Sequence, residues 1–230
     1  SPTAVIEYRH SRGWLVGNEN AGLHAMFTMM NNARLGVGIE GLSQCELATQ
    51  KALEFARNRK QGHAKIDNRK GVILDHPDVR RMLITMKALT AAVRALCLDA
   101  ALSLDLSKSN DKQLASKENA RASFLIPIAK AFSTDIGCRV ADIGIQVHGG
   151  MGYVEETGVA QVFRDVRVTA IYEGTNGIQA IDLVGRKLAD RGKAANGLID
   201  EMKITISNCS NHEDQQIRDM GHRLSKSLVC

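Results

Sequence analysis

The chain has 230 residues, of which 44% are hydrophobic, so it is long and apolar enough to bury one sizeable core. Its 3 prolines and 4% aromatic content favour long helices over a sheet, and we expect a mostly α-helical protein. The net charge of +5 would suit an anionic small molecule, while no Lys/Arg block with interleaved aromatic residues indicates a nucleic-acid surface. The five scattered cysteines show no metal-ligand spacing and suggest free thiols in a reduced compartment, and no apolar run predicts a membrane span.

The first part of the chain predicts a hairpin followed by a long helix. Residues 4–16 alternate apolar and polar positions around a Ser-Arg-Gly turn, which predicts a short β-hairpin. Apolar residues then recur at helical spacing over residues 22–57 and predict one long helix. Within this helix Gly36, Gly38 and Gly41 indicate that another backbone comes close.

Three further helices are predicted after a polar loop at residues 60–75. The second helix begins at Pro77, a residue tolerated in the first turn, and the third covers about residues 112–147, with a kink expected at Pro127. After a glycine-rich loop, the segment GVAQVFRDVRVTAI leads to a fourth helix over residues 175–189. These lengths and connections predict an all-α, up-down-up-down four-helix bundle.

The C-terminal tail is predicted to be helical as well. Its helical pattern starts near Gly197 and continues to the last residue, with an interruption at residues 208–211, Asn-Cys-Ser-Asn. It lies outside the predicted bundle.

Two glycine-containing elements carry the strongest local signal for a binding site. They are QVHGGMGY, which begins at Gln146, and YEGTNGIQ, which begins at Tyr172. Glycines at helix ends let backbone N–H groups approach a ligand, and a helix N-terminus favours phosphate. Either element alone is more often a plain helix cap. The carboxylate of Glu173 between them shifts the balance toward a site.

These elements belong to a longer resemblance. The stretch QVHGGMGYVEETGVAQVFRDVRVTAIYEGTNGIQAIDLVGRKL, together with MFTMMNNARLGVG and ALEFARNRKQG, resembles the acyl-CoA dehydrogenase family over roughly residues 14–190. The resemblance implies that residues 1–20 end the family's middle β domain and that residues 21–190 form its C-terminal four-helix bundle. It also implies that residues 191–230 begin the extra helical segment of the longer members.

The resemblance assigns Glu173 the role of catalytic base. In the family this carboxylate removes the substrate α-proton while the β-hydrogen leaves as hydride to N5 of FAD. Such a base must be a carboxylate in a dry pocket, because desolvation raises its proton affinity. Some relatives place the base on the first helix instead, at the position of Ala33, which cannot act as one. The ordinary alternative is an acid at a helix start that complements the helix dipole.

Further site residues follow from the same motifs. The resemblance implies substrate contacts for Asn31, Arg34, Tyr172 and Gly174. It implies FAD contacts for two groups of residues, which are Arg59, His76, Gln146, Val147, His148, Gly149 and Gly150 and, at the fourth helix, Thr175, Asn176 and Gly177. Asn31 departs from the usual aspartate, and the aromatic residue that usually follows the lysine and glutamine after Arg59 is absent. For His76 a helix cap is the simpler interpretation, and we expect no metal site.

We therefore expect part of an FAD-dependent acyl-CoA dehydrogenase that acts on fatty acyl-CoA or methylthiopropanoyl-CoA. The resemblance implies an electron-transfer flavoprotein as acceptor, a homodimer or homotetramer, and a bacterial cytoplasmic location. The 230 residues alone should be inactive and hold little flavin, because most of the pocket lies elsewhere in the family. Two alternatives stay open: an acyl-CoA oxidase, and a non-catalytic member that serves as an assembly or DNA-associated module.

Overall fold

A computed structural model describes residues 4–62 and 71–228, and these residues contain helices but no strands. The all-α prediction is therefore confirmed. The helices, with two 3₁₀ turns (η1 and η2) and one π-helical turn (η3), are α1 Gly22–Asn58, η1 Ile73–Asp75, α2 Pro77–Leu106, α3 Lys112–His148, α4 Gly150–Tyr153, η2 Glu155–Thr157, α5 Val159–Thr169, α6 Asn176–Asp182, η3 Leu183–Lys187, α7 Lys193–Ser210 and α8 Gln215–Ser227.

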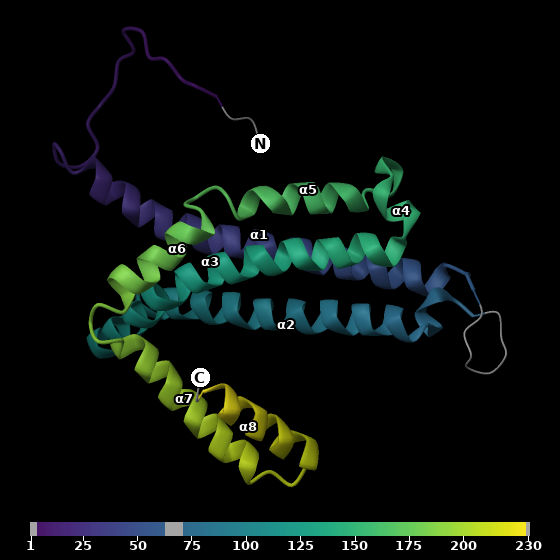
Figure 1. The fold of residues 1–230 in the computed structure, drawn as a ribbon. Coiled ribbons are helices and arrows are strands. Elements are labelled where there is room, and N and C mark those ends of the chain that lie inside the picture. The colour runs from purple at the N-terminus through teal and green to yellow at the C-terminus, as the bar shows by residue number, and fades with distance from the viewer. Residues whose placement is uncertain (1–3, 63–70, 229–230) are drawn as a thin grey trace.

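Helices α1, α2, α3 and α5 lie side by side in alternating directions and form the four-helix bundle (Figure 1). Their inward faces share one core, in which side chains such as Ala52, Met86, Val140 and Val166 are fully buried. The predicted up-down-up-down arrangement is confirmed. None of the described helices combines the length and apolarity needed to cross a bilayer.

The identity of the fourth bundle helix differs from the prediction. Helix α5 fills this place, although the sequence analysis predicts no helix there, because Val159, Val162 and Val166 share one buried face at helical spacing. The helix predicted at residues 175–189 does form, as α6 and the π-helical turn η3. It packs on α3 beyond the end of α5 (Figure 1).

The ends of the long helices follow from local chemistry. Pro77 occupies the first turn of α2, and the Asp111 side chain caps α3 by accepting from the backbone N–H groups of Gln113 at 2.9 Å and Leu114 at 3.2 Å. Helix α3 ends at Gly149, whose φ of 59° few other residues adopt. Pro127 lies inside α3, and the kink there stays a prediction.

Close contact between α1 and α3 depends on two of the three predicted glycines. A Cβ on Gly41 would lie 2.7 Å from the Ser133 carbonyl oxygen, and one on Gly38 would lie 3.4 Å from the Ala129 backbone. A Cβ on Gly36 would meet nothing within 4 Å. The predicted close approach is therefore confirmed at Gly38 and Gly41 and wrong at Gly36.

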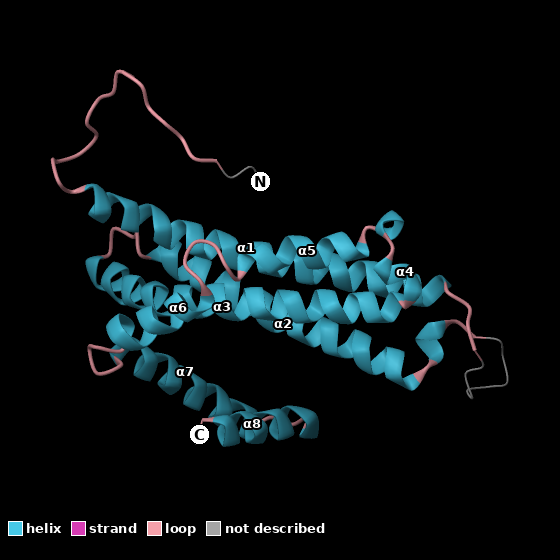
Figure 2. Cartoon of the chain, turned by 45° about the horizontal axis from the view of Figure 1, so that its top comes forward, coloured by secondary structure: helices cyan, strands magenta, loops and turns pink. Residues whose placement is uncertain are grey.

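The β-hairpin predicted at residues 4–16 is not formed. Residues 4–20 run as loop and turn away from the bundle, as Figure 2 shows, and apolar side chains such as Trp14 and Val16 are exposed. Two strands make a poor sheet on their own, and the described part of the chain offers them no third strand. The assignment of residues 1–20 to a β domain stays a prediction.

The tail forms a helical hairpin, α7 and α8, that projects from the bundle (Figure 1). The predicted interruption exists but lies later than predicted, because residues 208–210 still belong to α7 and the break covers residues 211–214. A Cβ on Gly221 of α8 would lie 2.6 Å from Cβ of Cys209, which shows how closely the two helices pack. Most of the predicted loop at residues 60–75 lies outside the described residues, in the gap at 63–70.

Candidate active site

Residues 170–175, which we call the Glu173 loop, connect α5 to α6. The loop is closed by a hydrogen bond from the Asn176 backbone N–H to the Ala170 carbonyl at 3.2 Å, and the Thr175 side chain caps α6 by accepting from the N–H of Ile178 at 3.3 Å. Glu173 has a φ of 54° and Gly174 a φ of 83°. A glutamate in this region is uncommon and carries backbone strain, so surrounding contacts must hold it there.

The side chains that hold the loop come from α3 and α6. Lys130 of α3 is 0% exposed, and its ammonium donates to the Gly174 carbonyl at 2.8 Å and to Oδ1 of Asn176 at 3.0 Å. Nε2 of buried Gln179 donates to the same Gly174 carbonyl at 3.1 Å and to the Glu173 carbonyl at 3.4 Å. Burial lowers the pKa of Lys130, while the nearby carboxylates of Asp135 and Glu173 act in the opposite direction.

Asn176 ties the start of α6 to the same part of α3. Its Nδ2 donates to Oδ1 of Asp135 at 2.7 Å and to Oγ1 of Thr134 at 3.0 Å. Asp135, Arg167, Thr175 and Asn176 lie around an open hollow of about 470 Å³ beside the loop. The N-terminus of α6 therefore faces a space that a ligand can enter, with Gly177 exposed in the first turn.

The Glu173 carboxylate itself is half-buried and receives no hydrogen bond or ion pair from the described residues. The neighbouring Tyr172 hydroxyl instead donates to Oε2 of Glu40 on α1. Burial and the Glu40 carboxylate raise the pKa of Tyr172 to about 12, so its phenol stays protonated at neutral pH. Among the described residues, the Glu173 carboxylate therefore has no hydrogen-bond or ion-pair partner.

Arg34, for which a substrate contact is predicted, lies inside the protein. Its guanidinium is 3% exposed and pairs at 2.7 Å with Asp182, which is 2% exposed and also meets Arg186 at 2.6 Å. Asn31, one turn earlier on α1, is half-buried. The charge of Arg34 is therefore compensated within the chain, at the junction of α6 and η3.

The other predicted FAD contacts gather at the C-terminal end of α3. Residues of the ends of α1 and α3 and the start of α2 surround a hollow of about 350 Å³, which we call the His148 hollow. The predicted residues that line it are Arg59, His76, Gln146, Val147, His148 and Gly149. Gly150 follows directly, as the first residue of α4.

Within this hollow the two histidines have different surroundings. The buried His148 ring packs on Phe55 with 4.4 Å between ring centroids, and its Nδ1 lies 2.7 Å from the Gly144 carbonyl. Burial lowers the pKa of His148, which favours the neutral imidazole. His76 is half-buried and binds the Gln61 carbonyl through Nε2 at 2.9 Å.

The predicted FAD contacts therefore form two groups within one chain. Thr175, Asn176 and Gly177 lie where α6 begins, beside the middle of α3, and the His148 group lies at the C-terminal end of α3, near α4 (Figure 1). No single pocket of the described chain brings the two groups together.

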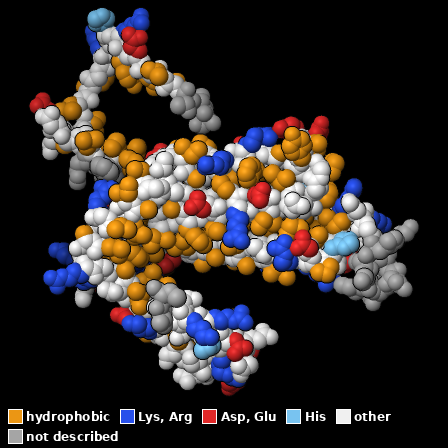
Figure 3. All heavy atoms as spheres, in the orientation of Figure 1, with side chains coloured by type: hydrophobic (Ala, Val, Ile, Leu, Met, Phe, Trp, Pro, Cys, Tyr) orange, Lys and Arg blue, Asp and Glu red, His pale blue; other side chains and the backbone are white. Residues whose placement is uncertain are grey.

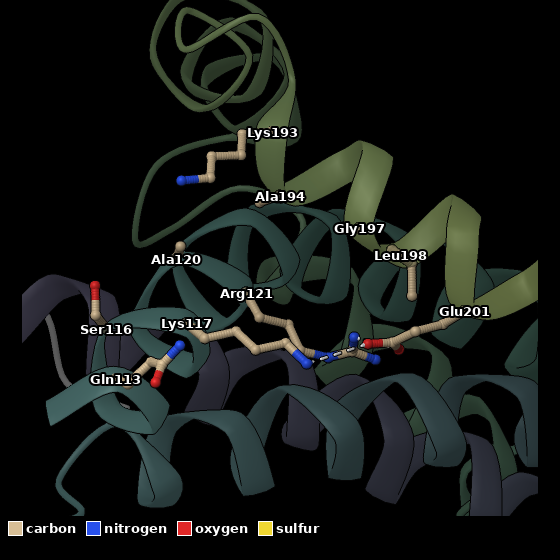
Figure 4. A pocket seen from close by; sticks show the side chains of 10 residues that line it. All are labelled: Gln113, Ser116, Lys117, Ala120, Arg121, Lys193, Ala194, Gly197, Leu198 and Glu201. Carbon is tan, nitrogen blue, oxygen red and sulfur yellow. Dashed lines mark hydrogen bonds and ion pairs between the residues drawn. The ribbon is translucent and has the colours of Figure 1, made fainter. Parts of the chain in front are cut away.

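A third hollow, of about 560 Å³, lies between α3 and α7 (Figure 4). Arg121 crosses it and bonds to Glu201 at 2.6 Å and to Asp99 of α2 at 2.9 Å. This hollow contains none of the predicted site residues. The bridge formed by Arg121 joins the tail to the bundle, and the chemistry of the lining does not indicate a reaction.

Sequence analysis missed Lys130, Gln179 and Asp182 as parts of the site. Lys130 offers a signal, because it is a lysine within the apolar run FLIPIAKAF of a helix and must therefore be buried or cover the core. Gln179 ends the motif YEGTNGIQ, but nothing in the sequence indicates that it or Asp182 supports the site, since polar residues in the first two turns of a short helix are common. In the described part of the chain no group of three His, Cys, Asp or Glu side chains is arranged for a metal ion.

Comparisons with known proteins agree with the all-α fold. Residues 20–189 match the family model described as acyl-CoA dehydrogenase, C-terminal domain. The chain is 48% identical over 198 residues to 3-methylmercaptopropionyl-CoA dehydrogenase of Ruegeria pomeroyi, covering 85% of this chain and 34% of that protein. It is 37% identical to a butyryl-CoA dehydrogenase of Syntrophomonas wolfei, covering 76% and 30%.

A solved structure extends the likeness to the tail. Caenorhabditis elegans ACDH-11 in complex with C11-CoA superposes with a TM-score of 0.78 over 93% of this chain and 34% of that one, at 22% identity, which shows a common fold. The bundle and the Glu173 loop define a helical domain of the kind found in flavin-dependent dehydrogenases. The chain belongs to the acyl-CoA dehydrogenase family, and it spans about a third of the length of the curated relatives it matches.

Proposed function

We propose that this chain contributes the catalytic base to an FAD-dependent acyl-CoA dehydrogenase that forms the α,β-double bond of an acyl-CoA thioester. The family's general reaction is this dehydrogenation. The observation that carries the proposal is Glu173, a carboxylate on a bent loop that Lys130 and Gln179 hold, while no described residue bonds to the carboxylate itself.

The chemistry demands such a group. The α-proton of a thioester is weakly acidic, so its removal needs a base close to the α-carbon and shielded from water. Glu173 is half-buried, and a bound acyl chain would shield it further. Its carboxylate takes the α-proton and is then a neutral acid. FAD, when bound, supplies the acceptor for the hydride that leaves the β-carbon.

The residues beside the middle of α3 and those at its C-terminal end suit FAD. Arg59 places an exposed guanidinium at the His148 hollow, where it can meet a pyrophosphate, and a Cβ on Gly149 would meet nothing within 4 Å, so its backbone is open to a ligand. Beside the middle of α3, the N-terminus of α6 is open at Thr175 and Asn176. Because the two groups of residues line separate hollows along α3, each group would serve a different flavin.

This division supports a homodimer or homotetramer in which one chain helps to bind its neighbour's FAD. Helix α2 offers a contact face, since Ile84, Leu98 and Leu102 are 67%, 60% and 58% exposed, and hydrophobic side chains gather over this helix in Figure 3. Family members are typically oligomeric and pass electrons to an electron-transferring flavoprotein. We propose the same acceptor here.

For the substrate we propose a short acyl-CoA, with the sulfur-bearing 3-methylmercaptopropionyl-CoA first. The 48% identity to the dehydrogenase of that name supports this choice.

The test is anaerobic mixing of the full-length flavoprotein with 3-methylmercaptopropionyl-CoA, butyryl-CoA and a long-chain acyl-CoA while flavin absorbance is followed. We expect rapid bleaching with the first. Glu173→Gln should slow it by at least about 10² to 10⁴, the usual contribution of a general base. Bleaching of Glu173→Gln at the parental rate would refute the role of Glu173.

A further inference from the structure

We propose that Lys130 is a positioning residue, which together with Gln179 holds the Glu173 loop in its strained conformation and turns two of its backbone N–H groups toward the ligand. The inference rests on the proposed function for its effect on catalysis. Its structural part stands on contacts within the chain. Lys130 lies outside the motifs that identify the loop, and Gln179 is the last residue of YEGTNGIQ, a motif that assigns it no role.

The burial of Lys130 needs an explanation. A lysine with no exposed side-chain surface is unfavourable unless its charge is compensated, and burial lowers its pKa. Its ammonium donates to the Gly174 carbonyl and to Oδ1 of Asn176, at 2.8 and 3.0 Å, and the nearby carboxylates of Asp135 and Glu173 favour the charged form. Both acceptors lie on the loop or at the start of α6. Both hydrogen bonds of the lysine side chain therefore go to the Glu173 loop and the residue that follows it.

The loop in turn needs such support. Glu173 and Gly174 both have positive φ, a conformation that a glutamate adopts only when its surroundings fix it. Lys130 and Gln179 grip the two carbonyl groups of these same residues, three contacts on two consecutive peptides. No other described side chain donates to either carbonyl.

The grip on the carbonyls also sets the direction of the amides. In a planar trans peptide the C=O of one residue and the N–H of the next point in opposite directions. With the Glu173 and Gly174 carbonyls turned toward Gln179 and Lys130, the N–H groups of Gly174 and Thr175 point away from these side chains. No described group accepts a hydrogen bond from either N–H. Two oriented donors beside the base are therefore available to an oxygen of a ligand.

The chain offers a matched control for this lysine. Lys117 lies on the same helix α3, where its side chain is 69% exposed and 3.8 Å from Glu201, far along the helix from the loop. Methionine has nearly the length of lysine without the charge, so Lys130→Met and Lys117→Met differ chiefly in whether a donor to the loop is lost. Gln179→Met removes the second donor and keeps the lysine.

Two measurements on the full-length flavoprotein test the proposal. The first is amide hydrogen exchange of the peptide covering residues 170–178, read by mass spectrometry. We expect Lys130→Met to speed exchange at least about tenfold, the equivalent of one lost hydrogen bond to a charged group, and Lys117→Met to leave it unchanged. This measurement does not depend on which residue is the base.

The second measurement is the rate of flavin bleaching by acyl-CoA beside the acyl-CoA dissociation constant. Lys130→Met should slow bleaching about a hundredfold, the effect of misplacing a reacting group by about 1 Å, with a change of less than about threefold in the dissociation constant. A change confined to substrate affinity is what a merely structural role would give, and it would overturn the proposal.

The outcomes separate the inference from the proposed function. Parental exchange in both Lys130→Met and Gln179→Met would overturn the positioning role, even if Glu173→Gln proves inactive. Faster exchange combined with an active Glu173→Gln variant would support the grip on the loop and refute Glu173 as the base. Should Lys130→Met fail to fold, Gln179→Met decides both measurements, with an expected slowing of bleaching by about tenfold.

Discussion

Two regions along α3 are built differently, namely its middle, beside the Glu173 loop, and its C-terminal end, at the His148 hollow. At the Glu173 loop, buried polar and charged side chains such as Lys130, Gln179 and Asp182 bond to backbone and to each other within a single chain. At the His148 hollow, most lining groups are exposed or helix-terminal, and they make few polar contacts, such as that of His76 with the Gln61 carbonyl. The Glu173 loop is held in place by contacts within the chain. The His148 hollow is an open partial surface, which suits the proposed sharing of a cofactor with another subunit.

The strongest way to break this comparison is to unpair the buried charges near the Glu173 loop. Asp182→Leu leaves the guanidinium of Arg34 buried without its partner, and we expect a loss of about 3 to 5 kcal/mol in the free energy of unfolding. Gln146→Ala, at the exposed lining of the His148 hollow, should change it by less than about 0.5 kcal/mol. Urea unfolding of each variant measures both values.

A double variant controls for lost packing. Arg34→Met with Asp182→Leu replaces the pair by apolar side chains and should recover most of the stability, because apolar replacements of buried pairs are often neutral. Equal losses for the single and double variants would show that the charge pair does not organise this region.

A second prediction concerns the packing of α1 against α3, the helix that carries both regions. Gly41→Ala should destabilise by about 1 to 3 kcal/mol, because its Cβ would lie 2.7 Å from the Ser133 carbonyl. Gly36→Ala, which meets nothing within 4 Å, should stabilise the helix by about 0.5 to 1 kcal/mol. Thermal unfolding gives the sign of each change. Two changes of the same sign would contradict the observed packing.

The third and smallest effect is a pH dependence at the His148 hollow. Burial lowers the pKa of His148 below its ordinary value of 6.5, so the unfolded chain binds more protons in the window just below that value. Stability should therefore fall as the pH drops from 7 through this window. His148→Gln should flatten this part of the profile. An unchanged slope in His148→Gln would place the pH dependence elsewhere.

The sequence predicts more of the fold than of the site. Helices α1, α2 and α3 were predictable because their apolar spacing, Pro77 and Gly149 act locally. The hairpin at residues 4–16 is wrong because alternation alone cannot supply the neighbouring strands that a sheet needs. Helix α5 is missed although Val162 and Val166 repeat at helical spacing, since a valine-rich segment has a low helix propensity.

The site divides in the same way. The loop around Glu173 follows from a motif that is contiguous in sequence. Its supports do not, because Lys130 meets Gly174 across 44 positions and Arg34 meets Asp182 across 148. Only the packing of α3 and α1 against α6 brings these pairs together, and a local pattern carries no information on it.

The most direct test compares the Glu173 loop with the His148 hollow in one experiment. It follows stopped-flow bleaching by acyl-CoA in the Glu173→Gln and His148→Gln variants of the full-length flavoprotein. Glu173→Gln should keep FAD and bind acyl-CoA yet lose bleaching by about 10² or more, whereas His148→Gln should lose FAD affinity and bleach near the parental rate once FAD is supplied in excess. The reverse result, with chemistry lost in His148→Gln and kept in Glu173→Gln, would contradict the account.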